Sequence, residues 1–303
     1  MPGNTLSIDL AAVPPIACSS ALRDELLRTI DLPHYFGSAF DRERAHRYLR
    51  AKIDRGAFDE AVAGLLGDGA LTERDHCLYA REVEGAPEEK KACSRDLFLR
   101  NRRHLRLLSR FPWVRFMGLT GANAFESCRP QDDLDLFVVT APDRLWLTFI
   151  AMIVWNRALG RRDLFCINYL VDEDHLRIAH ENYYTAVQLM SMVPLVDRGV
   201  GARLIEANRW AFEHLPNAAP TFESDPFYAL EHGRQASGPR QPRRPLLDAG
   251  NRQMFRVYAH RLRSKYPAAF GKGIVVSEGI AKLHPVDYGD LYEKIAGEGR
   301  PSP

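Results

Sequence analysis

The sequence predicts an α/β (α+β) fold, with one sheet flanked by helical segments at both ends of the chain. Three nearly continuous apolar segments, typical of strands buried on both faces, alternate with helical patterns in residues 113–171. Helical periodicity dominates before and after this region. The apolar content of 46% and the length of 303 residues allow a sizeable core, as one large domain or two smaller ones.

Charge and cysteine content narrow the class of protein. A net charge of +2 favours neither the presence nor the absence of a nucleic-acid partner, so any basic surface must be local. The five cysteines lack the spacing of a zinc site or a disulfide framework, which indicates reduced thiols and a cytoplasmic location. The longest apolar run, 145–155, is about half of a membrane span, so we expect a buried helix and no membrane partner.

Residues 1–87 are expected to form an N-terminal region of short helices, over 20–30, 41–53 and 57–69. The segment ALTERDHCLYA (70–80) alternates weakly and indicates a small β-hairpin. Two interpretations are open. The region is either a helical cap on the next domain or a degenerate winged helix.

The core is predicted to span residues 88–215. Its expected elements are a basic helix at 87–110, strands at 113–121, 133–140 and 164–171, a short helix at 122–127, a buried helix at 143–158, and helices at 183–196 and 201–215. Within these elements Trp146, Trp155 and Tyr169 are expected in the core.

Residues 216–303 are predicted to be a flexible linker followed by a C-terminal helical segment. The stretch 216–250 is rich in Pro, Ser and Arg, and such a segment buries too little apolar surface to offset its ordering entropy. A basic helix is expected at 251–266, and a final helix after His284 and Pro285. His284 is expected to be structural.

The chemistry is concentrated in GLTGANAFESCRPQDDLDLFVVT, residues 118–140. Side chains alternate along a strand, so Asp133 and Asp135 share one face while Leu134 points into the core. Two such carboxylates repel each other unless a cation or water separates them, and hard oxygen ligands suit Mg²⁺ or Mn²⁺. The glycine turn upstream offers backbone N–H groups to an anion. The alternative is a solvated strand start with turn-forming acids.

These residues resemble a known family. Thr120-Gly121-Ala122, ten intervening residues and Asp133-Leu134-Asp135-Leu136 are similar to the motif of the polymerase-beta-like nucleotidyltransferase superfamily. The likeness covers roughly residues 88–215 and includes NYYTAVQLMSMVPLVDR, which resembles bacterial nucleotidyltransferase-domain proteins. The resemblance implies a mixed-sheet nucleotidyltransferase core. It implies that Asp133 and Asp135 hold magnesium ions, and that Gly121, Ala122 and Asn123 cradle the phosphates of a nucleoside triphosphate.

The sequence departs from the family pattern at two positions. Ala122 stands where the family has Ser or Gly, and Asn123 is a candidate replacement for the missing hydroxyl. The family's third catalytic acid, on a later strand, corresponds to Asn168, which we expect to face the aspartates within about 8 Å of Asp135. Asp163 and Asp172, at the ends of that strand, take this place only if the register differs.

Two classes of function follow. The first is an enzyme that moves a nucleoside monophosphate from a nucleoside triphosphate to a small molecule, a protein side chain or an RNA end, with Asp133, Asp135 and Asn168 in the catalytic site. The second is a catalytically degenerate protein of the same fold, which binds nucleotide or nucleic acid or is recruited for a biosynthetic tailoring step.

Overall fold

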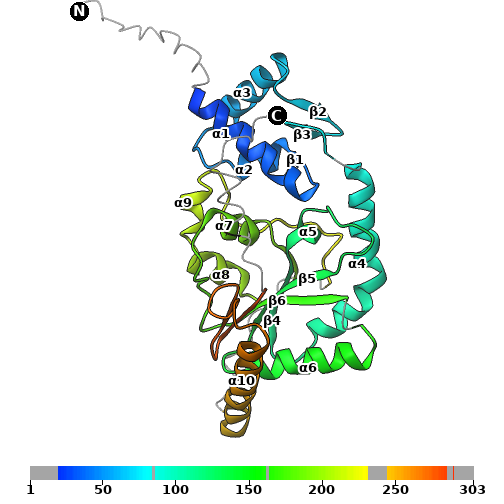
Figure 1. The fold of residues 1–303 in the computed structure, drawn as a ribbon, viewed down its shortest axis with the longest axis vertical. Helices are drawn as coiled ribbons and strands as arrows, with labels where there is room; N and C mark the ends of the chain where they lie inside the picture. Colours follow the sequence, from blue (N-terminus) through cyan, green and yellow to red (C-terminus); the bar gives the residue numbers. More distant parts are fainter. Residues whose placement is uncertain (1–19, 84–85, 162–163, 231–243, 285–288, 290–303) are drawn as a thin grey trace, which may run out of the picture.

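The structure is a computed structural model, and it describes residues 20–83, 86–161, 164–230, 244–284 and 289. These residues form a small three-stranded sheet near the N-terminus and a six-stranded sheet below it (Figure 1). No helix among the described residues is long and apolar enough to cross a membrane.

The N-terminal module, residues 20–83, contains both helices and a sheet. Its elements are α1 (Ser20–Asp31), the 3-10 helix η1 (Leu32–Phe36), β1 (Phe40–Asp41), α2 (Arg42–Arg47), α3 (Arg55–Gly67), β2 (Thr72–Arg74) and β3 (Cys77–Tyr79). The expected hairpin is confirmed, because β2 and β3 pair in antiparallel fashion and β1 extends them in the order β1-β3-β2. The N-terminal region is therefore not purely helical.

Two helices of this module, α2 and α3, begin where the sequence supplies acidic caps. The side chain of Asp41 accepts a hydrogen bond from the Arg44 amide at 2.7 Å, and Asp54 accepts one from the Ala57 amide at 3.0 Å. Each cap satisfies one backbone N–H that has no partner within its own helix, which fixes where α2 and α3 start.

The rest of the chain builds a mixed sheet in the order β7-β4-β5-β6-β9-β8. Its elements are α4 (Pro87–Ser109), β4 (Val114–Leu119), α5 (Gly121–Ala124), β5 (Leu134–Thr140), α6 (Leu145–Ala158), β6 (Phe165–Asp172), α7 (Tyr183–Met190), β7 (Val193–Asp197), α8 (Gly201–Ala207), α9 (Ala211–His214), α10 (Pro245–Lys265), β8 (Ile274–Val276) and β9 (Ile280–Leu283). Among these strands of the described residues, only β5 and β6 pair in parallel. The predicted α/β class, with strands near 113–121, 133–140 and 164–171, is confirmed.

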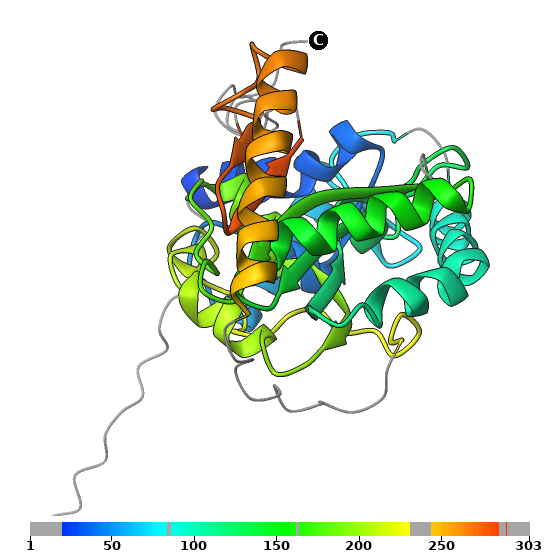
Figure 2. The same cartoon turned by 90° about the horizontal axis from the view of Figure 1, so that it is seen from below.

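Both faces of the sheet are covered. Successive residues of β5 point to opposite sides and therefore enter two different cores. Leu136 and Val138 pack in a core with α4 and α6, whereas Phe137 and Val139 belong to a second core. This second core also includes α7, α8 and the N-terminal module, which therefore packs against the sheet through a continuous apolar layer. Figure 2 shows the same structure from below, with α10 crossing near α6.

Helix α6 is the buried helix that the apolar run predicted, with one correction. Trp146 is fully buried, and its indole N–H donates to the Ser277 carbonyl at 2.8 Å. Trp155 is instead 38% exposed, at the far end of the helix. Tyr169 also differs from the expectation, because it is only partly buried and lines a cavity described below.

The predicted helix over 183–196 is wrong in its second half. Helix α7 ends at Met190, and Val193–Asp197 forms β7, which pairs with β4. Pro194 opposes Gly118 in this pairing, and β7 is the edge strand of the sheet. An edge strand tolerates proline because its missing N–H leaves no neighbouring strand unsatisfied. The expected helix over 201–215 is likewise two shorter helices, α8 and α9.

The C-terminal third also departs from the expectation. Residues 216–230 were expected to be loosely packed, but Tyr228 and Leu230 are buried, and the Leu230 amide donates to the Leu195 carbonyl at 3.0 Å. Helix α10 confirms the helix expected at 251–266, although it starts earlier. The hairpin β8–β9 was not predicted and extends the sheet beyond β6. The rest of the expected linker, 231–243, and the final helix after His284 lie outside the described residues.

Candidate functional site

Asp133 and Asp135 converge with Cys166 at one end of the parallel strand pair. One ligand atom of each of the three side chains lies within 4.8 Å of the others. Asp135 opposes Cys166 in the β5–β6 register, and side chains of opposed residues share a face of the sheet. The expectation that the two aspartates face one side is confirmed. Cys166 was missed as a neighbour, because only the strand pairing reveals it.

Asn168 faces the same cluster, as expected. The β5–β6 register shifts by one residue between Leu136 and Phe137, which leaves Asn168 as the extra residue of a bulge on β6. Its amide nitrogen donates a hydrogen bond to Asp135, and its amide oxygen accepts one from the Cys166 thiol at 2.7 Å. Asn168 therefore contacts Asp135 directly, well inside the predicted distance.

Asp172, one of the two alternative acids, does not join this cluster. Asp172 opposes Thr140 at the other end of the strand pair. There its carboxylate is buried, with His175 Nδ1 at 2.6 Å and the Asp174 amide at 3.1 Å. Asp163 lies outside the described residues.

The cluster holds its carboxylates in an unfavourable environment for negative charge. Burial, followed by repulsion from Asp133, raises the pKa of Asp135 to about 7, although the hydrogen bond from Asn168 acts in the opposite direction. Burial is also the main cause that raises the pKa of Asp133. Burial and the two carboxylates raise the pKa of Cys166 to about 12, so it is a neutral thiol at pH 7. A cation beside the aspartates would relieve both the desolvation and the repulsion.

The backbone of the glycine turn lies close to Asp135. The Thr120 amide donates to the backbone carbonyl of Asp135 at 3.1 Å, which closes the turn on the strand. Gly121 has φ +60°, and a Cβ at this position would lie 2.8 Å from Asp135 Oδ2. Its N–H donates to the Gln188 side chain at 3.3 Å. Only glycine combines this left-handed conformation with so close an approach to the carboxylate.

Asn123 does not occupy the position that the resemblance implied. Its side chain is 3% exposed, and its amide nitrogen donates to the backbone carbonyl of Asp133 at 2.9 Å. It is not among the residues that line the adjacent cavity, whereas Gly121 and Ala122 are. The interpretation of its side chain as a phosphate contact is therefore corrected. Asn123 fixes the backbone of Asp133, because a buried amide must satisfy its hydrogen bonds internally.

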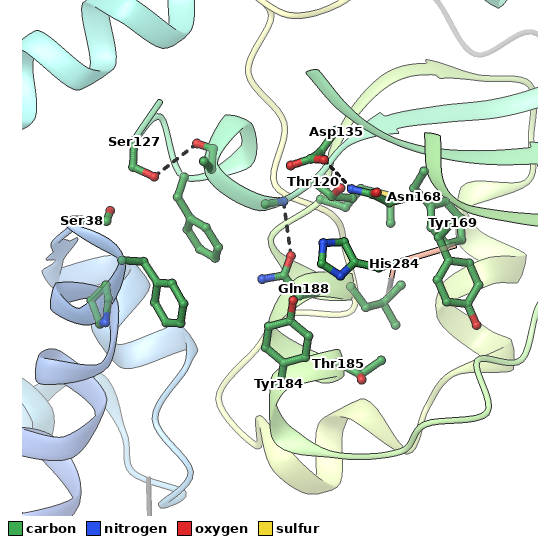
Figure 3. A pocket seen from close by; sticks show the side chains of 18 of the residues that line it. Ser38, Thr120, Ser127, Asp135, Asn168, Tyr169, Tyr184, Thr185, Gln188 and His284 are labelled. Carbon is green, nitrogen blue, oxygen red and sulfur yellow. Dashed lines mark hydrogen bonds between the residues drawn. The ribbon is translucent and has the colours of Figure 1, made fainter. Parts of the chain in front are cut away.

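Asp135 and Asn168 open onto a cavity of about 580 Å³ between the sheet, α7 and the N-terminal module (Figure 3). Its polar lining includes Thr120, Asp132, Asp135, Asn168, His180, Gln188, Lys282 and His284. His284 was expected to be structural, but it follows β9 and reaches the cavity near Asn168. Nothing local in the sequence indicates this position, because it depends on the pairing of β9 with β6.

The donor set fits a hard divalent cation. Carboxylate oxygens of Asp133 and Asp135 and the amide oxygen of Asn168 are ligand types that Mg²⁺ and Mn²⁺ accept. Cys166 is a softer donor, but its raised pKa keeps it protonated and so a poor ligand at neutral pH. The two aspartates would hold the ion, with Asn168 orienting Asp135.

Comparisons with known proteins do not assign this site. No family model, no curated protein and no solved structure matches the chain. The site itself must therefore carry any functional conclusion.

Proposed function

We propose that this protein is a magnesium-dependent nucleotidyltransferase that moves a nucleoside monophosphate from a nucleoside triphosphate to an acceptor. The observation that carries the proposal is the convergence of Asp133 and Asp135 beside the Gly121 turn, where Asp135 lines a cavity of about 580 Å³. Ligand cavities for small molecules have volumes of about 300–1,000 Å³.

Each part of the site has a role in this proposal. Asp133 and Asp135 hold the metal, and Asn168 fixes the orientation of Asp135 through its hydrogen bond. When bound, the metal would neutralise phosphate charge and align the triphosphate for displacement. The backbone at Gly121 and Ala122 lines the cavity next to Asp135, and the absence of a side chain at Gly121 leaves room for the Asp135 carboxylate at the point where the phosphates would bind. The acceptor is a small molecule, a protein side chain or an RNA end.

A second candidate is a protein that binds nucleotide without transferring it. Asn168 favours this alternative, because it stands where the resemblance places a third acid and an amide cannot act as a base. Cys166, the other side chain of β6 in the cluster, is a thiol with a raised pKa and does not replace a carboxylate at neutral pH. Both candidates require magnesium-dependent nucleotide binding, but only the enzyme transfers a nucleoside monophosphate to an acceptor.

The proposal predicts that at least one of ATP, GTP, CTP and UTP stabilises the protein in the presence of Mg²⁺ and much less in its absence. At a nucleotide concentration one hundred times Kd, the stabilisation should be about 2.7 kcal/mol. Thermal unfolding with each nucleotide, with Mg²⁺ or with EDTA, measures it. Release of pyrophosphate in the presence of candidate acceptors then separates enzyme from binder. The absence of stabilisation by all four nucleotides contradicts both candidates.

Asn168→Asp is expected to strengthen magnesium binding, because it supplies a third carboxylate to the cluster. The apo protein should become less stable at pH 8, since the new charge is placed beside Asp135. Titration with Mg²⁺, followed by calorimetry, should give a Kd lower by about tenfold, which corresponds to about 1.4 kcal/mol. Asn168→Ala is the matched control and should not strengthen binding. An unchanged Kd in Asn168→Asp would place the metal away from β6.

A further inference from the structure

The N-terminal module supplies aromatic side chains to the same cavity. Tyr35 and Phe36, the last two residues of η1, line it and remain 41% and 37% exposed. Phe40, from β1, also lines the cavity but is buried. These two side chains offer the cavity apolar surface whose burial by a ligand would be favourable.

Tyr35 is held in place by contacts within the module. Pro33 is the second residue of η1, and Gly37, which follows the helix, adopts the left-handed conformation with φ +68°. The guanidinium of Arg81 lies 4.0 Å from the centre of the Tyr35 ring and is itself held by Asp31, with Nε and Oδ1 2.7 Å apart. One face of the tyrosine is thus covered by the protein. The wall is preorganised, which lowers the entropy cost of binding a ligand against it.

The wall contributed by the core has matching chemistry. Phe137 and Tyr169 stack with ring centres 5.5 Å apart, and both line the cavity together with Tyr184. Hydroxyl groups also line the cavity, from Ser38 on the module and from Ser127 and Thr185 on the core, where Thr185 lies near Tyr184 (Figure 3). Aromatic faces with neutral hydrogen-bonding groups at their edges suit a flat, polar-edged ring.

The surface of the module does not suit a nucleic-acid partner, although its element order is that of a winged helix. In such modules a helix enters the DNA groove and basic side chains contact phosphates. Helix α3 carries one cation, Arg55, which pairs with Asp59 at 2.9 Å, and it also carries Glu60. In the hairpin, Arg74 pairs with Glu82 at 3.1 Å. The features that distinguish this module are therefore the aromatic residues it adds to the cavity.

We propose that the N-terminal module is part of the substrate site and that Tyr35 and Phe36 bind the nucleobase of the nucleotide. This inference rests on the proposed function, which places the phosphates at Gly121 and Asp135 in the same cavity. Tyr35 and Phe36 contact the base, whereas the metal and the phosphates bind at the end of the cavity that contains Asp135. Base stacking on aromatic side chains tolerates any of the four bases, so selectivity falls to the surrounding hydroxyl groups.

The test compares a nucleotide with inorganic tripolyphosphate, which has the phosphates but no base. Calorimetry would measure the Kd of each with Mg²⁺, using the nucleoside triphosphate that stabilises the wild type most. The variant Tyr35→Ala/Phe36→Ala should weaken nucleotide binding by about tenfold or more, the typical effect of losing base stacking. Its Kd for tripolyphosphate should stay that of the wild type, which also shows that the variant is folded. Trp155→Ala is the matched control, since it removes another exposed aromatic away from the cavity.

Tyr35→Leu is a milder second variant that retains apolar bulk but removes the ring, and it should weaken only nucleotide binding. Equal nucleotide affinity in wild type and variants would overturn the inference while leaving the proposed function intact. Equal losses for nucleotide and tripolyphosphate would also overturn it, because the module would then act through the phosphates or the fold. If the wild type binds no nucleotide with Mg²⁺, the proposed function fails first, and the inference with it.

Discussion

Asp135→Asn is expected to abolish magnesium-dependent stabilisation by nucleotide and to make the apo protein more stable at pH 8. The aspartate is a proposed metal ligand, and an amide is a far weaker one. Without a metal the same aspartate destabilises the fold, because burial and repulsion from Asp133 oppose its charge. The two effects have opposite signs, which distinguishes a metal-binding residue from one that only supports the fold.

The pH dependence follows from the raised pKa. In the folded state the pKa of Asp135 is about 7, against 3.8 for an ordinary aspartate. Between about pH 4 and pH 7 the folded protein retains a proton that the unfolded chain has released, so the stability of the apo wild type falls as pH rises through this window. The loss is complete above pH 7 and has an upper limit of about 4 kcal/mol. An asparagine side chain does not ionise, so the Asp135→Asn variant does not lose stability in this way as the pH rises.

Urea unfolding of wild type and Asp135→Asn at pH 5 and pH 8, without divalent ions, measures the difference. The variant should gain stability relative to the wild type as the pH rises. Asp96→Asn is the matched control, because it removes an exposed carboxylate of α4 that pairs with Arg100. Magnesium-dependent nucleotide binding in both Asp133→Asn and Asp135→Asn would place the metal site elsewhere. Unfolding of both variants at every pH would make the pair structural.

Gly121→Ala is expected to lower the free energy of unfolding by about 2–3 kcal/mol and to abolish nucleotide binding. The left-handed conformation alone costs a residue with a side chain about 1–2 kcal/mol. In addition, the new Cβ would lie 2.8 Å from Asp135 Oδ2, so the carboxylate must move. A shift of this ligand displaces it from Asn168 and from the geometry that a metal requires.

Gly160→Ala provides a matched control for this effect. Gly160 has nearly the same conformation, with φ +64°, but the space that a Cβ would take there is open, with no contact within 4 Å beyond its chain neighbours. This variant should show only the conformational cost and should bind nucleotide like the wild type. Chemical denaturation and nucleotide-dependent thermal shifts of the two variants separate backbone strain from the clash with Asp135. Retention of nucleotide binding in Gly121→Ala would argue against a site at the turn.

The local features of the site could be predicted from the sequence because they depend on neighbouring residues alone. Alternation along a strand places Asp133 and Asp135 on one face, whatever the rest of the chain does. The glycine turn before them is also a local signal. The apolar segments of β4, β5 and β6 identify a buried sheet, since few other structures hide so many consecutive apolar residues.

The tertiary structure decided which distant segments complete the site. Cys166 and Asn168 lie next to Asp135 because of the register and the bulge of the β5–β6 pair. His284 lines the cavity because β9 extends the sheet beyond β6. Strands β7 and β9 are short, and β7 contains Pro194, so neither shows a strong strand pattern of its own. Tyr35 and Phe36 come from η1, which is far from Asp135 in the chain. Such contacts form because the module and the sheet share one apolar core, and burial of that core depends on the whole fold.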